Sequence, residues 1–470
     1  MSNNKLDPQR LFPADPASRS VAAKLYETVA GLPIISPHGH TDPRWFAEDK
    51  AFPDPAQLFI VPDHYVFRML LSQGIDLSAL GVPRTDEGWT ERDSRKIWRL
   101  FAQNYHLFRA TPSRMWLDHA FQEVFGWNSR LCAENADAAY DHIADCLTRP
   151  EFRPRALFER FNIEIIATTE SPLDDLKWHQ QIRDDDWNGR VITAYRPDPV
   201  VDPDFEGFTA NVEKLGELAG EDTTSWKGYL RAHRVRREYF KSFGATSSDH
   251  GHPTARTENL SENKVEELFQ KALTGRCTPD EADAFRGHML TEMALMSLDD
   301  GLVLQIHPGS FRNHSNPIMD IYGRDKGFDI PTSTDYVKSL RPMLDRVGLE
   351  KDLSIILFTL DETAYSRELA PLAGAYPTLK LGPAWWFHDS PEGMRRFREM
   401  TTETAGFYNT VGFNDDTRAL CSIPARHDVA RRVDCAFLAT LVTSGRLDED
   451  EAFEVAHDLT YRLAKEAYRL

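Results

Sequence analysis

The sequence predicts a (β/α)8 barrel, a fold in which eight parallel strands alternate with helices. Three observations lead to this fold class. Eight short apolar runs are spread along the chain, and stretches with apolar residues at helical spacing lie between them. Several runs are apolar without alternation, as expected for strands buried on both faces. A doubly wound sheet is the alternative, but its first strand is usually followed by a glycine-rich phosphate turn, where this chain has Pro-His-Gly-His at 37–40.

The expected strands follow one another along the chain, and most of them end in or next to an ionisable or aromatic side chain. The fourth run, GATSSDH, is polar and is assigned as a strand mainly from its position. The runs are Pro33–His40, Ile163–Glu170, Val191–Arg196, Gly244–His250, Leu302–His307, Leu353–Thr359, Thr378–Trp385 and Asn409–Phe413.

Helical periodicity separates these runs. Apolar residues recur three and four positions apart, which places them on one face of a helix. The sets are Val265, Leu268, Phe269 and Ala272 before the fifth run; Val337, Leu340, Leu344 and Val347 before the sixth; and Ala452, Val455, Leu459 and Leu463 near the C-terminus.

The spacing of the runs is uneven, which predicts insertions in the barrel. About 120 residues separate the first two runs, and they carry helical patterns such as that from Trp98 to Phe108. We therefore expect an N-terminal helical segment at 1–32 and a barrel at 33–470. Residues 41–160 would form an inserted helical cap beside the barrel mouth, and 251–300 a second helical insertion.

Composition excludes several classes of function. The 55 basic and 73 acidic residues give a net charge of −18, which argues against general binding to nucleic acids or anionic membranes. An anionic substrate stays open, because a few arginines in a pocket outweigh a distant surface. No apolar run is long enough to span a membrane, and the N-terminus lacks the apolar core of a signal peptide. The five cysteines form no CxxC pair. A cytoplasmic enzyme with reduced thiols is expected.

The clearest candidate site is His38-Gly39-His40 at the end of the first run. In a strand, residues two positions apart face the same side, so both imidazoles could reach one ion in the barrel mouth. Zinc and similar cations accept neutral imidazole readily. Two surface histidines in a loop are the plainer interpretation, and the position at a strand end favours the metal.

Asp415-Asp416 follows the eighth run, which lies next to the first when a barrel closes. A carboxylate there could complete a His-His-Asp site and could also carry a proton. A solvated acidic turn is the alternative, and periodicity does not decide which of the two side chains points inward.

Other polar and aromatic residues cluster near the strand ends, where a barrel of this kind carries its chemistry. His307 ends the fifth run and could contact a metal or substrate or be a buried core residue. Guanidinium groups bind carboxylates through two parallel hydrogen bonds, so several at the mouth suggest an anionic substrate. Trp385 and Trp386 could form a wall for a sugar or simply pack. The arginines are Arg196, Arg312, Arg418 and Arg426.

These residues together resemble the uronate isomerase (glucuronate isomerase) family, a divergent branch of the amidohydrolase superfamily. The resemblance covers nearly the whole chain and rests on the order and spacing of its motifs. They are LPIISPHGH, DHYVFR at 63–68, ATTESPLDDL at 167–176, YRPDP at 195–199, ATSSDHG at 245–251, IHPGSFRN at 306–313, GFD at 327–329, AWWFHDSPEGM at 384–394 and DDTRALCSIPARH at 415–427.

The resemblance implies a barrel of the amidohydrolase kind and one divalent metal ion, expected to be Zn²⁺. The family pattern Thr-Asp-Ser-Arg corresponds to Asp415-Asp416-Thr417-Arg418 here, so Asp416 would be the ligand beside His38 and His40. The family's Asp-His-Tyr motif implies that His64 and Tyr65 contact substrate, and its Arg-Pro-Asp motif implies the same for Arg196. The chain departs from the family at Thr41-Asp42, where Leu-Ser is usual, and at Glu170-Ser171, where Asp-Asp is usual.

We therefore expect an aldose–ketose isomerase that interconverts D-glucuronate and D-fructuronate, and also D-galacturonate and D-tagaturonate. Asp416 would be the base, with Tyr65 and Arg418 stabilising the enediolate. The substrate would also meet His64, His307, Trp385 and Trp386, and its carboxylate would be held by Arg196 with Arg312 or Arg426. No NAD and no ATP is needed. No nucleic acid or membrane partner is expected, and assembly into a homo-oligomer stays open.

Two other classes of function remain as alternatives. The first is a metal-dependent hydrolase of a lactone, amide or ester on the same barrel. Binuclear hydrolases of this kind often carry a bridging lysine or glutamate on strand four, and the run GATSSDH offers no lysine. The second is a sugar-acid binder without catalysis, which would not need the acid–base groups.

Overall fold

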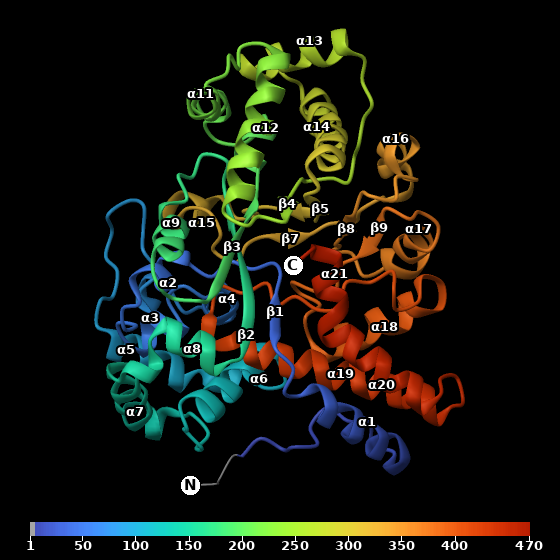
Figure 1. The fold of residues 1–470 in the computed structure, drawn as a ribbon. Helices are drawn as coiled ribbons and strands as arrows, with labels where there is room; N and C mark the ends of the chain where they lie inside the picture. The colour runs from blue at the N-terminus through green and yellow to red at the C-terminus, as the bar shows by residue number, and fades with distance from the viewer. Residues whose placement is uncertain (1–4) are drawn as a thin grey trace.

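The computed structural model describes residues 5–470, and within these residues its centre is a sheet of seven parallel strands in the order β1-β2-β3-β4-β5-β8-β9. The order follows the chain, which is the arrangement of a curling barrel sheet (Figure 1). The strands are β1 (Ile34–Ser36), β2 (Ile163–Glu170), β3 (Arg190–Tyr195), β4 (Ser247–His250), β5 (Val303–Ile306), β8 (Ile355–Leu357) and β9 (Leu379–Leu381). A short antiparallel pair, β6 (Ser310–Phe311) and β7 (Ile330–Pro331), stands apart from the sheet.

The barrel prediction is confirmed as a fold class, with one difference at the closing seam. Each of the first seven predicted runs overlaps a strand, whereas 409–413 joins β9 only through a bridge between Leu381 and Thr410. Gly412 has a φ of 75°, which interrupts the extended backbone that a ladder needs. The loops that follow this segment and β1 still meet, since the His40 amide donates to the Thr417 carbonyl at 3.1 Å.

Helices surround the sheet (Figure 1). Along the chain, some precede β2, some lie between β2 and β5, and the rest follow β5. The first group is α1 (Pro16–Val29), α2 (Pro43–Glu48), α3 (Pro55–Phe59), α4 (His64–Leu71), α5 (Ser94–Gln103), α6 (Pro112–His119), α7 (Ala136–Thr148) and α8 (Pro154–Arg160). The middle group is α9 (Lys177–Asp184), α10 (Asp198–Val201), α11 (Phe208–Ala219), α12 (Trp226–Ser242), α13 (Glu262–Leu273) and α14 (Pro279–Asp300). The last group is α15 (Asn316–Tyr322), α16 (Val337–Val347), α17 (Ala370–Ala373), α18 (Pro391–Ala405), α19 (Ile423–Thr443), α20 (Glu449–His457) and α21 (Leu463–Tyr468).

The predicted helical sets bury one face, with one exception. Val265, Leu268, Phe269 and Ala272 of α13 are all buried in the largest apolar cluster. In α16, however, Val337 is 48% exposed, and Met343 takes its place on the buried face. Val337 stands at the first position of the helix.

The long insertion after β1 forms helices α2 to α8, which lie at lower left in Figure 1 and share an aromatic-rich apolar cluster. Trp98 at its centre is fully buried and donates through Nε1 to the Ala136 carbonyl at 2.9 Å. Residues 251–300 supply α13 and α14 at the top of the view. The proposed unit boundaries at 41–160 and 251–300 stay a prediction, and residues 1–4 of the predicted 1–32 segment lie outside the described residues.

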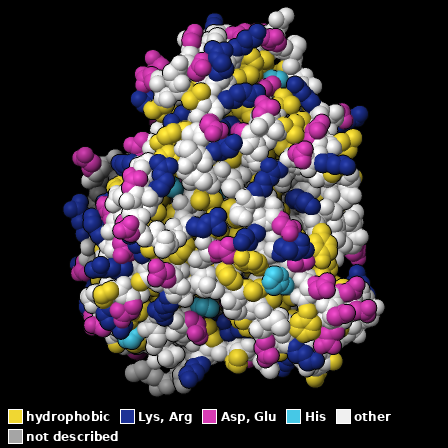
Figure 2. Space-filling view, viewed as in Figure 1, with side chains coloured by type: hydrophobic (Ala, Val, Ile, Leu, Met, Phe, Trp, Pro, Cys, Tyr) yellow, Lys and Arg dark blue, Asp and Glu magenta, His cyan; other side chains and the backbone are white. Residues whose placement is uncertain are grey.

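The surface mixes charges of both signs (Figure 2). On the visible face, lysine and arginine side chains are interspersed with acidic ones, and acidic side chains gather over α20, whose first turn carries Glu449, Asp450 and Glu451. None of the helices described for residues 5–470 is both long and apolar enough to cross a membrane. All five cysteines are free thiols.

Candidate active site

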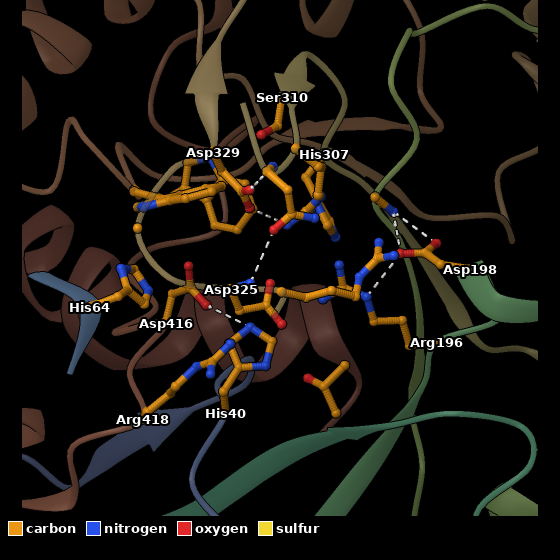
Figure 3. Close-up of a pocket in the computed structure, with 18 of the residues that line it drawn as sticks. His40, His64, Arg196, Asp198, His307, Ser310, Asp325, Asp329, Asp416 and Arg418 are labelled. Carbon is orange, nitrogen blue, oxygen red and sulfur yellow. Dashed lines mark hydrogen bonds and ion pairs between the residues drawn. The ribbon is translucent and has the colours of Figure 1, made fainter. Parts of the chain in front are cut away.

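A pocket of about 740 Å³ opens at the carboxyl ends of the strands. Every residue that the sequence nominates for catalysis, substrate binding or metal binding lines it, and Figure 3 shows several of them pointing toward its centre. They are His38, His40, His64, Tyr65, Arg196, His307, Arg312, Trp385, Trp386, Asp416, Arg418 and Arg426.

His38, His40 and Asp416 converge on one point. Asp416 Oδ1 lies 3.5 Å from His38 Nε2 and 3.3 Å from His40 Nε2. The two histidines follow β1 rather than belonging to it, because the strand ends at Ser36. Instead of a ladder, the Gly39 carbonyl accepts from Thr169 Oγ1 at 2.9 Å, which holds the loop against β2.

These three side chains fit a divalent metal ion. One nitrogen or oxygen of each lies within 4.8 Å of the others, and two imidazoles with a carboxylate are a donor set that zinc accepts. Among the described residues, His38 Nε2 and Asp416 Oδ1 are buried without a hydrogen-bond partner, a costly arrangement that a bound cation would relieve. Three protein ligands leave coordination positions open for water or substrate.

The two neighbouring aspartates point in different directions. Asp416 has a φ of 40°, a left-handed conformation that turns its carboxylate into the pocket. Asp415 faces the other way, and its Oδ2 accepts a hydrogen bond from His427 Nε2 of α19 at 3.0 Å. The choice between the two, which periodicity left open, is therefore made by the backbone turn after the eighth run.

His64 and Tyr65 reach the pocket because α4 starts there. Asp63 caps the helix, and its Oδ1 accepts from the Tyr65 amide at 2.8 Å. Burial, with Arg418 and Arg68 nearby, lowers the pKa of His64 to about 3, so the imidazole is neutral. Burial raises the pKa of Tyr65 well above its ordinary value, which keeps its hydroxyl a hydrogen-bond donor.

Arg196 is anchored by two carboxylates. Its Nε donates to Asp198 Oδ2 at 3.0 Å, and its Nη1 lies 3.3 Å from Asp249 Oδ2. Asp249 is fully buried and also pairs with His307 Nε2 at 2.9 Å. The guanidinium is thereby fixed in position on the pocket wall.

Gly251 lets three of these side chains come together. A Cβ at this position would stand 2.7 Å from His307 Cε1, 2.8 Å from Arg196 Nη2 and 3.0 Å from Arg312 Nη2. Only a residue without a side chain fits there unless those groups move. Arg312 is held from the far side, where Nη1 donates to Asp329 Oδ2 at 3.0 Å.

Arg418 and Arg426 differ in their exposure and in their ion-pair partners. The Arg418 guanidinium forms no ion pair or hydrogen bond within residues 5–470 and is exposed to the pocket. Arg426 is buried, donates to Asp389 Oδ2 at 2.7 Å, and stacks on Trp116 with its guanidinium carbon 3.5 Å from the ring centroid. This geometry favours Arg418 for direct contact with a ligand.

The two tryptophans also take different places. Trp385 is buried, with its ring centroid 5.1 Å from that of His307 and 6.0 Å from that of His38, so it packs against both histidines. Trp386 is only partly buried, and the Arg312 guanidinium carbon lies 5.9 Å from its ring. Trp386 is therefore the better placed of the two to meet a sugar.

Several acidic residues of the site were given no role from the sequence. Asp198, Asp249, Asp329 and Asp389 each hold an arginine, and Asp325 lines the pocket from the loop before β7. Asp249 is the next-to-last residue of the fourth run, and Asp329 belongs to the GFD motif. Its position near a strand end was therefore the signal that could have identified Asp249.

Known proteins are similar to this chain in sequence and fold, and they identify its family. The family model for glucuronate isomerase matches residues 16–468, which is nearly the whole chain. The chain belongs to the glucuronate isomerase family. A curated uronate isomerase from Rhizobium meliloti (strain 1021) is 68% identical over 465 residues, which cover 99% of each chain.

Solved structures of the same family agree. The crystal structure of glucuronate isomerase from Caulobacter crescentus superposes with a TM-score of 0.97 at 60% identity, covering 99% of this chain and 97% of that one. Uronate isomerase from Thermotoga maritima superposes with a TM-score of 0.92 at 27% identity, covering 99% of each chain. The hydrolase alternative is accordingly not favoured, because full-length relatives carry the isomerase name.

One departure from the family pattern has a measurable consequence. Glu170, at the end of β2, accepts hydrogen bonds from Thr168 at 2.9 Å and from Thr193, yet burial raises its pKa to about 8. The folded state thus holds the proton more tightly than the unfolded chain, where the ordinary value is 4.5. Its contribution to stability is complete below pH 4.5 and is lost as the pH rises to about 8.

Glu170→Gln is therefore expected to leave stability unchanged at pH 4 and to raise it at pH 9, by at most about 5 kcal/mol. Thermal unfolding of both proteins at the two pH values measures the difference. Because the glutamine is neutral throughout, equal pH dependence in the two proteins would show that Glu170 is already ionised at neutral pH.

Proposed function

We propose that this chain interconverts D-glucuronate and D-fructuronate, and also D-galacturonate and D-tagaturonate, through an enediol. The observation that carries the proposal is that one pocket joins His38, His40 and Asp416 to Arg196 and Arg418. The first group suits proton transfer beside a sugar carbonyl, and the arginines suit a carboxylate at the other end of the molecule. Family membership supports the same reaction.

The reaction moves one proton from C2 to C1 and one between the two oxygens. Asp416, turned into the pocket, is our candidate to take the proton from C2. That step leaves an enediolate, and the neutral Tyr65 hydroxyl and the Arg418 guanidinium would stabilise its negative oxygen. Returning the proton to C1 completes the ketose without any net oxidation, so neither NAD nor ATP is required.

A divalent ion on His38, His40 and Asp416, expected to be Zn²⁺, would supply Lewis-acid polarisation of a substrate oxygen. His64 and Trp386 line the same pocket and are candidates to contact the sugar. His307 and the buried Trp385 are better placed to support Asp249 and the histidines than to reach the substrate themselves. The metal's identity, assembly into oligomers and a cytoplasmic location stay predictions from the sequence.

Arg196 is the candidate to bind the substrate carboxylate, with Arg312 beside it and Arg426 behind Asp389. Losing a charge-assisted pair costs roughly 1.5–3 kcal/mol. Arg196→Met should therefore lower kcat/KM for glucuronate by about ten- to a hundredfold. Arg196→Lys keeps the charge but not the fork, so it should also be impaired.

Glucose, which lacks the carboxylate, is the control substrate for this prediction. Wild type should turn it over very poorly, and Arg196→Met should reduce that residual rate far less than the glucuronate rate. If both rates fell equally, Arg196 would not bind the carboxylate, and Arg312, Arg418 or Arg426 would become the candidate. Equal turnover of glucose and glucuronate by the wild type would contradict the hexuronate assignment.

The reaction itself is tested in deuterated water. An isomerase should exchange the C2 proton of glucuronate and galacturonate and form the corresponding ketoses. A non-catalytic binder would bind either sugar without exchange, and a hydrolase would act on lactones or esters instead. Ketose formation measured with and without a chelator also reports whether a divalent ion is needed.

A further inference from the structure

A second cluster of histidines lies on the other side of β4. Ser247 and Asp249 face the barrel interior, where Ser247 Oγ accepts from Gln305 Nε2 at 3.0 Å and Asp249 meets His307. Since successive side chains of a strand point to opposite faces, His250 faces outward, toward the helices. Its Nε2 lies 3.3 Å from Ser248 Oγ on the same side.

His250 and His252 form a second pair with one residue between them, and Asp198 at the start of α10 stands beside them. One ligand atom of each of the three lies within 4.8 Å of the others. Ligands of a tetrahedral zinc ion, each about 2.0–2.1 Å from the metal, lie about 3.4 Å apart. Closing the cluster around an ion therefore takes movements of no more than about 1.5 Å, estimated from that spacing.

The two imidazoles are buried and unsatisfied. His250 is 0% and His252 is 3% exposed. Within residues 5–470, His252 Nδ1 and Nε2 and His250 Nδ1 have no hydrogen-bond partner. A buried polar nitrogen normally has a hydrogen-bond partner. These nitrogens therefore need a bound group to satisfy them, either a cation that accepts their lone pairs or a water molecule.

The charges around the cluster admit a cation. Arg237 of α12, on the side of His250, is bound to Asp300 at 2.6 Å. Arg286 of α14, on the side of His252, is bound to Asp202 at 2.6 Å and to Asp204 at 2.8 Å. Arg196 is bound to Asp198 and to Asp249. Each nearby guanidinium thus already has a carboxylate partner.

The protonation states point the same way. Both imidazoles are buried, and Asp198 Oδ2 accepts from Arg196 Nε at 3.0 Å, an arrangement that favours neutral rings and an ionised carboxylate. Two neutral imidazoles and one carboxylate are ligands of the zinc class rather than of Ca²⁺ or Mg²⁺, which prefer oxygen.

We propose that Asp198, His250 and His252 bind a second divalent cation of the zinc class, at a site separate from His38, His40 and Asp416. The ion would tie the end of β4 to the start of α10, where the Gly251 amide already donates to Asp198 Oδ1 at 3.1 Å. Since Asp198 also holds Arg196, the site would position that arginine from behind the pocket wall.

Metal content of the full-length protein tests the proposal. Protein stripped with a chelator, reloaded with excess Zn²⁺ and desalted should contain two Zn²⁺ per chain. His252→Asn and His250→Gln should each contain one, and His40→Ala should also contain one by losing the other site. His288→Asn, which removes an equally buried histidine from α14, is the matched control and should retain two.

A crystal of the wild type decides the question even if the variants fail to fold. Anomalous scattering at the zinc edge should give a peak in contact with His252 as well as one at His40. One Zn²⁺ per chain in the reloaded wild type, two retained in both cluster variants, or an ordered water without anomalous signal between Asp198 and His252 would each overturn the proposal.

Discussion

His40→Ala is expected to remove the divalent ion from the pocket and to lower kcat/KM for glucuronate by at least about a thousandfold. A bound ion contributes several kcal/mol of charge stabilisation, and each ~1.4 kcal/mol corresponds to a factor of about ten. The fold should survive, because His40 lies past the end of β1 and its side chain is 28% exposed. Metal analysis, circular dichroism and turnover on the same preparation provide the measurement.

The control for this experiment is His64→Ala. His64 lines the same pocket but is not one of the three proposed ligands His38, His40 and Asp416, so its loss should leave metal content unchanged even if turnover falls. His38→Ala should behave as His40→Ala does in metal content, with a larger loss of stability because it is buried. A His40→Ala protein that binds metal normally and turns over at the wild-type rate would show that the ligand set is misplaced.

The fold was predictable from sequence because most strands of a buried parallel sheet are runs of apolar residues. The run at 163–170 coincides with β2, and even the polar run at 244–250 contains β4. The irregular backbone of the eighth run, 409–413, could not be predicted, because its pattern of apolar residues is that of a strand. What breaks the ladder is the left-handed backbone at Gly412, which the pattern of apolar residues does not reveal.

The pocket was predictable to the extent that strand ends converge. Residues such as His38, Arg196 and His307 lie at the ends of different strands, and parallel topology brings those ends together. The acids that hold the arginines were harder to identify, since pairing depends on distance in space. Asp389 follows a strand end, but nothing in the sequence indicates that it forms an ion pair with Arg426 and not with Arg418.

The Asp-Asp pair gives the sharpest internal test of the catalytic proposal. Asp416→Asn should lower kcat by about 10²–10⁴-fold, the usual contribution of a general base. Asp415→Asn should change kcat little, because its carboxylate faces His427 of α19 and not the pocket. It should instead lower the melting temperature, since Asp415 is 2% exposed and its charge-assisted hydrogen bond with His427 would be weakened.

Two measurements separate the roles that Asp416 combines. If the asparagine variant still binds the metal ion but no longer exchanges the C2 proton in deuterated water, the carboxylate acts as the base. If metal content falls together with exchange, the carboxylate is needed first as a ligand, and adding excess Zn²⁺ should restore part of the exchange. The opposite pattern, with Asp415→Asn inactive and Asp416→Asn nearly normal, would contradict the assignment, because the carboxylate 3.3 Å from His40 would then take no part in the reaction.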